Sequence, residues 1–132
     1  MDDTISERLL DQRLRNRIME ALLGLVDWRE DLPSWGAGEY FEGVFDFLPY
    51  RRIWPNSALT DAERLAVSKV HGMMAAACDS TPKFVTTDRL IATGRPVRIA
   101  TAAEEALAIM LERGRFSEDE EEDTPSTPIA WP

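Results

Sequence analysis

The sequence predicts a mainly α-helical fold, a compact bundle of about four principal helices. Three observations favour it: apolar residues recur at three- and four-residue steps, three segments carry the Thr-x-x-Glu spacing of a capping box, and 44% hydrophobic with 30% charged residues is a globular composition. A chain of 132 residues fits one domain. We expect that domain at residues 1–116, followed by a tail at 117–132.

The first helix is predicted from Thr4 to Val26. Thr4 and Glu7 have capping-box spacing, in which each side chain satisfies the other residue's backbone N–H. Asp11 and Arg15 are four residues apart, so we expect them to pair on the helix surface. The residues of the predicted apolar stripe are Leu10, Leu14, Ile18, Ala21, Leu22 and Leu25.

A second helix is predicted after a Gly-rich link that holds Trp35, Gly36 and Gly38. One side of this helix is apolar and the opposite side is acidic, which is the pattern of an amphipathic helix. We expect it to run for about three turns and to end at Pro49. Its apolar arc consists of Tyr40, Phe41, Val44, Phe45, Phe47 and Leu48.

Capping boxes predict two further helices, which begin at Thr60–Glu63 and at Thr101–Glu104. The helix after Thr60 has an apolar face and a reverse face of small residues, so we place it at the centre of the bundle. Gly114 is suited to the left-handed conformation that often follows the end of a helix. It is expected to follow the last helix.

Residues 79–100 are predicted to be irregular. The segments Phe84–Thr87 and Val97–Ile99 contain strand-like residues and would form a short two-stranded pairing. Residues 88–92 would form a short helix closed by Gly94. The sequence alone does not decide between these conformations.

Charge and cysteine content narrow the classes of function. A formal net charge of −9 disfavours nucleic acid as a general partner. No apolar run reaches the roughly 20 residues of a membrane helix, and the acidic start Met1–Thr4 is unlike a secretory signal. The lone cysteine, Cys78, can form no internal disulfide. We therefore expect a reduced, cytoplasmic protein.

The C-terminal tail is the most acidic part of the chain. Glu118–Asp123 is a run of six carboxylates, and Thr124–Pro128, which follows, contains two prolines and no core-forming residue. This composition predicts that residues 117–132 are disordered. Trp131 makes the end of the tail apolar again, and it is a candidate anchor that would bind in a groove of a partner.

Arginines are concentrated in the first helix, at Arg8, Arg13, Arg15 and Arg17. Thirteen arginines against two lysines favour bidentate contacts with anions, although the same bias arises from nucleotide composition. Both interpretations remain open.

The segment from Trp28 to Trp54 holds eight of the eleven aromatic residues. Tryptophans in loops beside arginines have the composition of a binding hot spot. Our leading hypothesis is a non-catalytic protein–protein interaction module of the adaptor, inhibitor or immunity type, whose partner is another protein, for example one of basic character. Self-association of the aromatic face as an isologous dimer is a separate alternative. The predicted partner-binding residues are Trp28, Trp35, Tyr50, Arg51, Arg52, Trp54 and Trp131.

The alternative is a small-ligand-binding or enzymatic helical domain with an inter-helix pocket for an anionic or aromatic ligand. Glu42 and His71 would supply polar groups to such a pocket, and Arg51 or Arg52 would bind the anion. A border histidine is more often satisfied by a backbone group than catalytic, and no phosphate loop, nucleophile elbow or zinc motif occurs. We predict no cofactor and no metal site.

Overall fold

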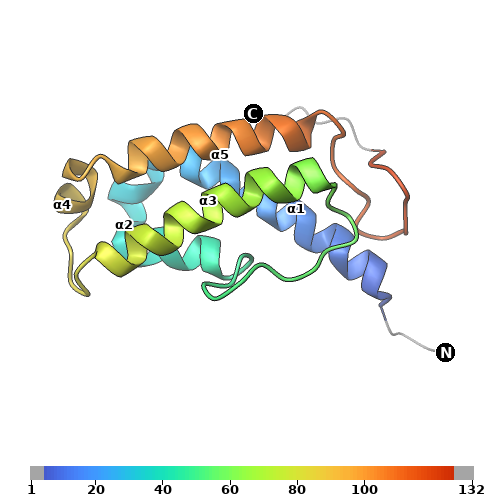
Figure 1. Ribbon diagram of the computed structural model, residues 1–132, viewed down its shortest axis with the longest axis horizontal. Helices are drawn as coiled ribbons and strands as arrows, with labels where there is room; N and C mark the ends of the chain where they lie inside the picture. The colour runs from blue at the N-terminus through green and yellow to red at the C-terminus, as the bar shows by residue number, and fades with distance from the viewer. Residues whose placement is uncertain (1–4, 127–132) are drawn as a thin grey trace.

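The computed structural model describes residues 5–126 and is mainly helical, as predicted (Figure 1). Within these residues it contains five helices and no strand. The helices are α1 (Glu7–Val26), α2 (Trp28–Phe45), α3 (Asp61–Ser80), α4 (Thr87–Ala92) and α5 (Arg95–Leu111).

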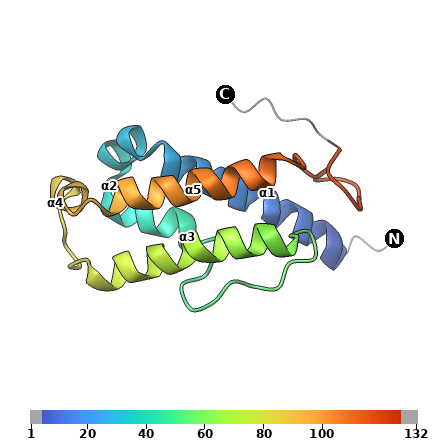
Figure 2. The ribbon, with the colours of Figure 1, turned by 45° about the horizontal axis from the view of Figure 1, so that its top comes forward.

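The three long helices α1, α3 and α5 form the body of the molecule. Helix α5 packs against both α1 and α3, and it runs in the opposite direction to them (Figures 1 and 2). Helix α2 packs against α1 and α4, at the end of the molecule where α1 finishes. The loop 46–60 then returns the chain to the other end, where α3 begins (Figure 1).

The hydrophobic core lies where these helices meet. Helix α3 contributes residues from its whole length, and α5 contributes small alanines that allow close approach between helices. Side chains at the centre of the core that are at most 2% exposed include Ile18, Met19, Leu22, Leu25, Val67, Val70, Met74, Ala103, Ala106 and Met110.

Two helix starts show how side chains satisfy free backbone N–H groups. The predicted capping box of α3 is confirmed, because Thr60 Oγ1 accepts from the Glu63 amide at 3.1 Å and Glu63 Oε1 accepts from the Thr60 amide at 3.1 Å. Helix α1 is capped by Ser6, whose hydroxyl accepts from the Leu9 amide at 3.1 Å. The predicted cap residue of α1, Thr4, lies outside the described residues.

The predicted apolar stripe of α1 is wrong at Leu10, whereas Leu14 packs against the core as predicted. Leu10 is 50% exposed, whereas Gln12, Arg15 and Asn16 are fully buried. The predicted surface pair of Asp11 with Arg15 is also wrong, because Asp11 Oδ2 accepts from the amide and hydroxyl of Ser57 instead. Polar side chains can face inward here because the C-terminal segment supplies backbone acceptors to them.

Residues 117–126, predicted as part of a disordered tail, lie at the end of the molecule where α1 begins (Figure 1). The Gln12 amide donates to the carbonyls of Ser117 at 3.0 Å and Glu120 at 2.8 Å. Arg8 Nη2 donates to the Glu122 carbonyl at 2.7 Å. Side chains of α1 therefore bind the backbone of the acidic run, which charge composition alone does not reveal.

The predicted two-stranded pairing near 79–100 is wrong. The short helix predicted there is α4, and Val97–Ile99 lies inside α5. Helix α5 starts at Arg95, ahead of the predicted capping box, because Gly94 with φ 76° turns the chain and Pro96 favours a first helical turn. Gly114 has φ 95° beyond the end of α5, in the left-handed conformation that its sequence position predicts.

Candidate functional site

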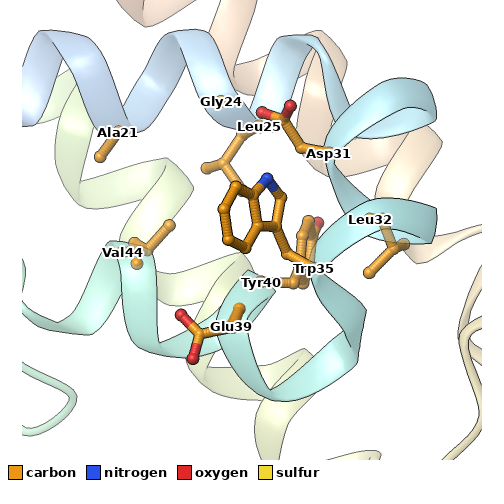
Figure 3. Close-up of a pocket in the computed structure, with 10 residues that line it drawn as sticks. Ala21, Gly24, Leu25, Asp31, Leu32, Trp35, Glu39, Tyr40 and Val44 are labelled. Carbon is orange, nitrogen blue, oxygen red and sulfur yellow. The ribbon is translucent and has the colours of Figure 1, made fainter.

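An open cleft of about 340 Å³ separates α1 from α2 (Figure 3). This volume lies within the range of ligand-binding pockets. Its walls are mostly apolar, and a few polar side chains stand among them. The residues that line it are Ala21, Gly24 and Leu25 of α1 with Asp31, Leu32, Trp35, Glu39, Tyr40, Gly43 and Val44 of α2.

A kink in α2 gives the cleft its shape. Gly36 has φ 87° and ψ 170°, which breaks the helical path between two helical pieces. The Gly-rich link predicted from the sequence is this kink, so the second helix begins at Trp28 rather than near Tyr40. It ends at Phe45, before the predicted end at Pro49. A positive φ at this position requires glycine, because a Cβ atom would be strained there.

Trp35 precedes the kink and is 70% exposed. Its indole stands in the cleft among the lining side chains, with the ring nitrogen on the side of Asp31 (Figure 3). A large aromatic ring held this far into solvent gains little from burial within its own chain. Trp35 is therefore the lining residue that is most available to a binding partner.

The floor of the cleft carries an unsatisfied hydroxyl. Tyr40 is 9% exposed, and within residues 5–126 its buried oxygen has no hydrogen-bond partner. Burial raises the pKa of the Tyr40 phenol well above its ordinary value, so the group stays protonated. A neutral phenol can both donate and accept one hydrogen bond, and here it does neither.

Two carboxylates flank the cleft. Asp31 is half-buried and Glu39 is exposed. Within the described part of the chain, neither one forms a salt bridge or accepts a side-chain hydrogen bond, and no arginine, lysine or histidine is among the lining residues. The polar groups of the cleft are thus mainly acceptors.

Of the predicted partner-binding residues, only Trp35 lines this cleft. Trp28 is 5% exposed and belongs to the core, with the Arg29 guanidinium 4.5 Å from its ring centre. It lies in a helix rather than in the exposed loop that the sequence suggested. Trp131 lies outside the described residues.

The other predicted residues form a separate, exposed patch on the loop 46–60. Trp54 is 46% exposed and Tyr50 is 43% exposed, and Arg51 and Arg52 are exposed beside them. The Tyr50 hydroxyl donates to Asp79 at the end of α3. This loop patch contains no lining residue of the α1–α2 cleft.

The alternative pocket around Glu42 and His71 is not formed at the α1–α2 cleft. His71 Nε2 lies 2.8 Å from the carbonyl oxygen of Pro49, and its ring makes an edge contact with Phe45. Glu42 is exposed on α2. In residues 5–126, no group of three or more His, Cys, Asp or Glu side chains is arranged to hold a metal ion.

The arginines of α1 bind groups of their own chain. Arg13 donates to the Glu118 carbonyl at 2.7 Å, and Arg17 pairs with the carboxylates of Glu20 and Glu118. Arg15 is fully buried and donates to Glu63, and to the Met110 and Gly114 carbonyls at 3.0 and 2.7 Å. These contacts account for the arginine cluster without an external anion.

Glu63 is the shared acceptor of Arg15 and Arg113. Burial by itself would raise the pKa of this carboxyl, but hydrogen bonds from Arg113, Arg15 and the Thr60 amide outweigh it and lower the pKa to about 2. The carboxylate is therefore ionised at neutral pH. It forms a buried structural ion pair with the arginines, and it lacks the solvent exposure that a reacting group needs.

Comparison with known proteins gives no relative: no family model, no curated protein and no solved structure matches the chain. None of the helices in the described residues is long and apolar enough to cross a membrane. The functional argument therefore depends on the cleft itself.

Three residues of the candidate site escaped sequence reasoning: Asp31, Glu39 and Tyr40. Tyr40 belongs to the predicted apolar arc of the second helix and Glu39 to its acidic side, and neither position by itself indicates a neighbouring cleft. The available signal was the sequence Trp35-Gly36, because a glycine after a tryptophan can turn a helix and leave the ring outside the core.

Proposed function

We propose that the protein is a non-catalytic protein–protein interaction module that receives a side chain of its partner in the α1–α2 cleft, beside Trp35. The observation that carries this proposal is the position of Trp35, 70% exposed at an apolar cleft of about 340 Å³. Tryptophans in such positions are enriched among the residues that dominate binding energy. The loop patch at Tyr50–Trp54 is a second, peripheral part of the proposed surface.

A non-catalytic function is supported by the way the reactive side chains are used. His71 contacts a backbone carbonyl, and Glu63 is held by two arginines. Tyr40 and the carboxylates Asp31 and Glu39 are the polar residues that remain at the cleft. They provide hydrogen-bond acceptors for recognition, and they include neither a nucleophile paired with a base nor a metal-binding cluster.

Site-directed photocrosslinking tests the proposal. A photoreactive phenylalanine analogue replaces Trp35 in the full chain inside the source cells, and a matched control replaces Leu65, which is 75% exposed on α3. We expect one protein to be captured from position 35 and not from position 65. The captured protein is then purified, and its affinity for the wild-type chain and for the Trp35→Ala variant is measured.

Two results would contradict the proposal. One is equal capture at both positions, which would indicate nonspecific collision. The other is that position 35 captures further copies of this chain and no other protein, which would indicate self-association.

A further inference from the structure

We infer that the α1–α2 cleft is specific for an organic cation, and that the partner protein supplies it as an arginine side chain. The inference rests on the proposed function, since it names the group that the partner inserts. It is supported by the chemistry of the side chains that line the cleft.

The polar lining of the cleft matches a group that is rich in hydrogen-bond donors. Asp31 and Glu39 can only accept hydrogen bonds when ionised. A guanidinium carries five N–H donors and no acceptor, so it complements both of them. A carboxylate or phosphate in the same place would be repelled by both. The chemistry of the lining thus disfavours an anionic ligand in this cleft.

The two carboxylates at the cleft are available to an external cationic partner. Glu20, Glu63 and Glu118 all accept from arginines of the chain. Asp31 and Glu39 form no such pair within residues 5–126, although they lie next to the same cleft. An external cation at this site would pair with Asp31 and Glu39, as arginines of the chain pair with carboxylates elsewhere in the molecule.

The Tyr40 hydroxyl is an independent indication of a ligand. Its oxygen is buried without a partner among the described residues, and the view of the cleft shows it pointing to the side where Asp31 lies (Figure 3). A buried polar group that lacks a hydrogen bond destabilises a fold. Tyr50, by contrast, donates to Asp79. Once the side chains around this oxygen shift to admit the ligand, an N–H of an inserted cation would give Tyr40 the partner that its own chain does not.

The apolar surface of the cleft favours arginine over a compact cation. The indole of Trp35 offers a face on which a planar guanidinium can stack. Leu25 and Val44 lie opposite each other in α1 and α2 and can cover the methylene groups of the side chain (Figure 3). One long amphipathic side chain would thus meet both the apolar and the acidic parts of the lining.

A pair of peptides that differ in charge alone tests the inference. The probes are acetyl-Gly-Gly-Arg-Gly-Gly-amide and the same peptide with citrulline, whose neutral urea has the shape of a guanidinium. Binding is followed by NMR through the indole N–H signal of Trp35 in the full chain, which is assigned with the Trp35→Phe variant. At low salt we expect the arginine peptide to bind at least about tenfold more tightly than the citrulline peptide.

Two double variants, each of which removes two negative charges, show which carboxylates cause the preference for arginine. Asp31→Asn with Glu39→Gln should remove the preference for arginine. Glu42→Gln with Asp46→Asn, which changes exposed carboxylates of α2 and its C-cap outside the cleft, should retain it. Equal loss in both double variants would overturn the assignment to Asp31 and Glu39.

The remaining outcomes separate the inference from the proposed function. Equal affinity for the arginine and citrulline peptides would overturn the cation inference and leave the cleft as a binding site. If neither peptide shifts the Trp35 signal, the inference is overturned and the proposed function loses its site as well.

Discussion

Arg15 of α1 and Glu63 of α3 form an ion pair removed from solvent, with Nη2 and Oε2 2.9 Å apart and side chains 0% and 1% exposed. Arg113 binds the same carboxylate at 2.7 Å from the segment after α5. One carboxylate therefore joins the first helix, the third helix and the chain beyond the fifth. Burial of such charges is tolerated only because every one of them is paired.

Replacing Glu63 by glutamine should strongly destabilise the fold. The substitution keeps the shape but leaves the buried Arg15 guanidinium without a counter-charge, for which the expected cost is about 3–5 kcal/mol. The control is Glu105→Gln, because Glu105 pairs with Lys69 at 3.6 Å on the surface, with both side chains over 60% exposed. That change should cost at most about 1 kcal/mol. Urea unfolding of the two variants measures both, and similar values would contradict the central role of Glu63.

Stability should fall with acidification in a defined window. Because folding lowers the Glu63 pKa from 4.5 to about 2, its contribution is complete above pH 4.5 and is lost as the pH falls towards 2. A lowering of this size corresponds to about 3 kcal/mol. Urea unfolding at several pH values between 7 and 2 should show this loss in the wild type and a smaller loss in Glu63→Gln. An equally steep loss in the variant would assign the acid sensitivity to other carboxylates.

A side chain at Gly36 should destabilise the fold through backbone strain. Gly36→Ala puts a Cβ atom at φ 87° and ψ 170°, at an expected cost of about 1–3 kcal/mol, although no neighbouring atom would clash with it. Gly38→Ala is the matched control, because its Cβ would also meet open space and its φ is not positive. It should be neutral or stabilising. Thermal unfolding compares the two variants, and equal melting temperatures would show that the kink does not depend on glycine.

The contact between Gln12 and the C-terminal segment should protect the Glu122 amide from hydrogen exchange. This amide donates to Gln12 Oε1 at 2.8 Å, so Gln12→Ala should speed its exchange. The Arg89 amide, which donates to the Thr86 hydroxyl at 3.2 Å at the start of α4, should be unaffected and serves as the internal control. Unchanged exchange at Glu122 in the variant would indicate that Gln12 does not hold the segment.

Sequence patterns predicted the helices better than they predicted the polar interior. The Thr60–Glu63 box and the apolar residues of α3 identify that helix because its signals are local. Arg15 lies three residues before Ile18, at a position of the buried face, but arginine is so seldom fully buried that periodicity could not place it there. The oxygen atoms that accept its hydrogen bonds are 48 residues away or more in the sequence, so only the folded chain reveals them.

Only part of the candidate site is evident from the sequence, because its geometry also depends on contacts that form in the folded chain. The tryptophans stand out by composition, yet Trp28 is core and Trp35, next to the kink at Gly36, is exposed. A lone glycine in a sequence does not specify the direction of a kink. The cleft depends on that direction, and so it could not be predicted.

The most direct test of the cleft as the interaction site is the affinity of the purified partner for two tryptophan variants. Trp35→Ala should weaken binding by about 30-fold or more, as expected for a hot-spot residue, while the melting temperature stays close to that of the wild type because the ring is 70% exposed. Trp54→Ala, on the separate loop patch, should have a smaller effect. Unchanged affinity in Trp35→Ala, or a larger loss in Trp54→Ala, would contradict the account.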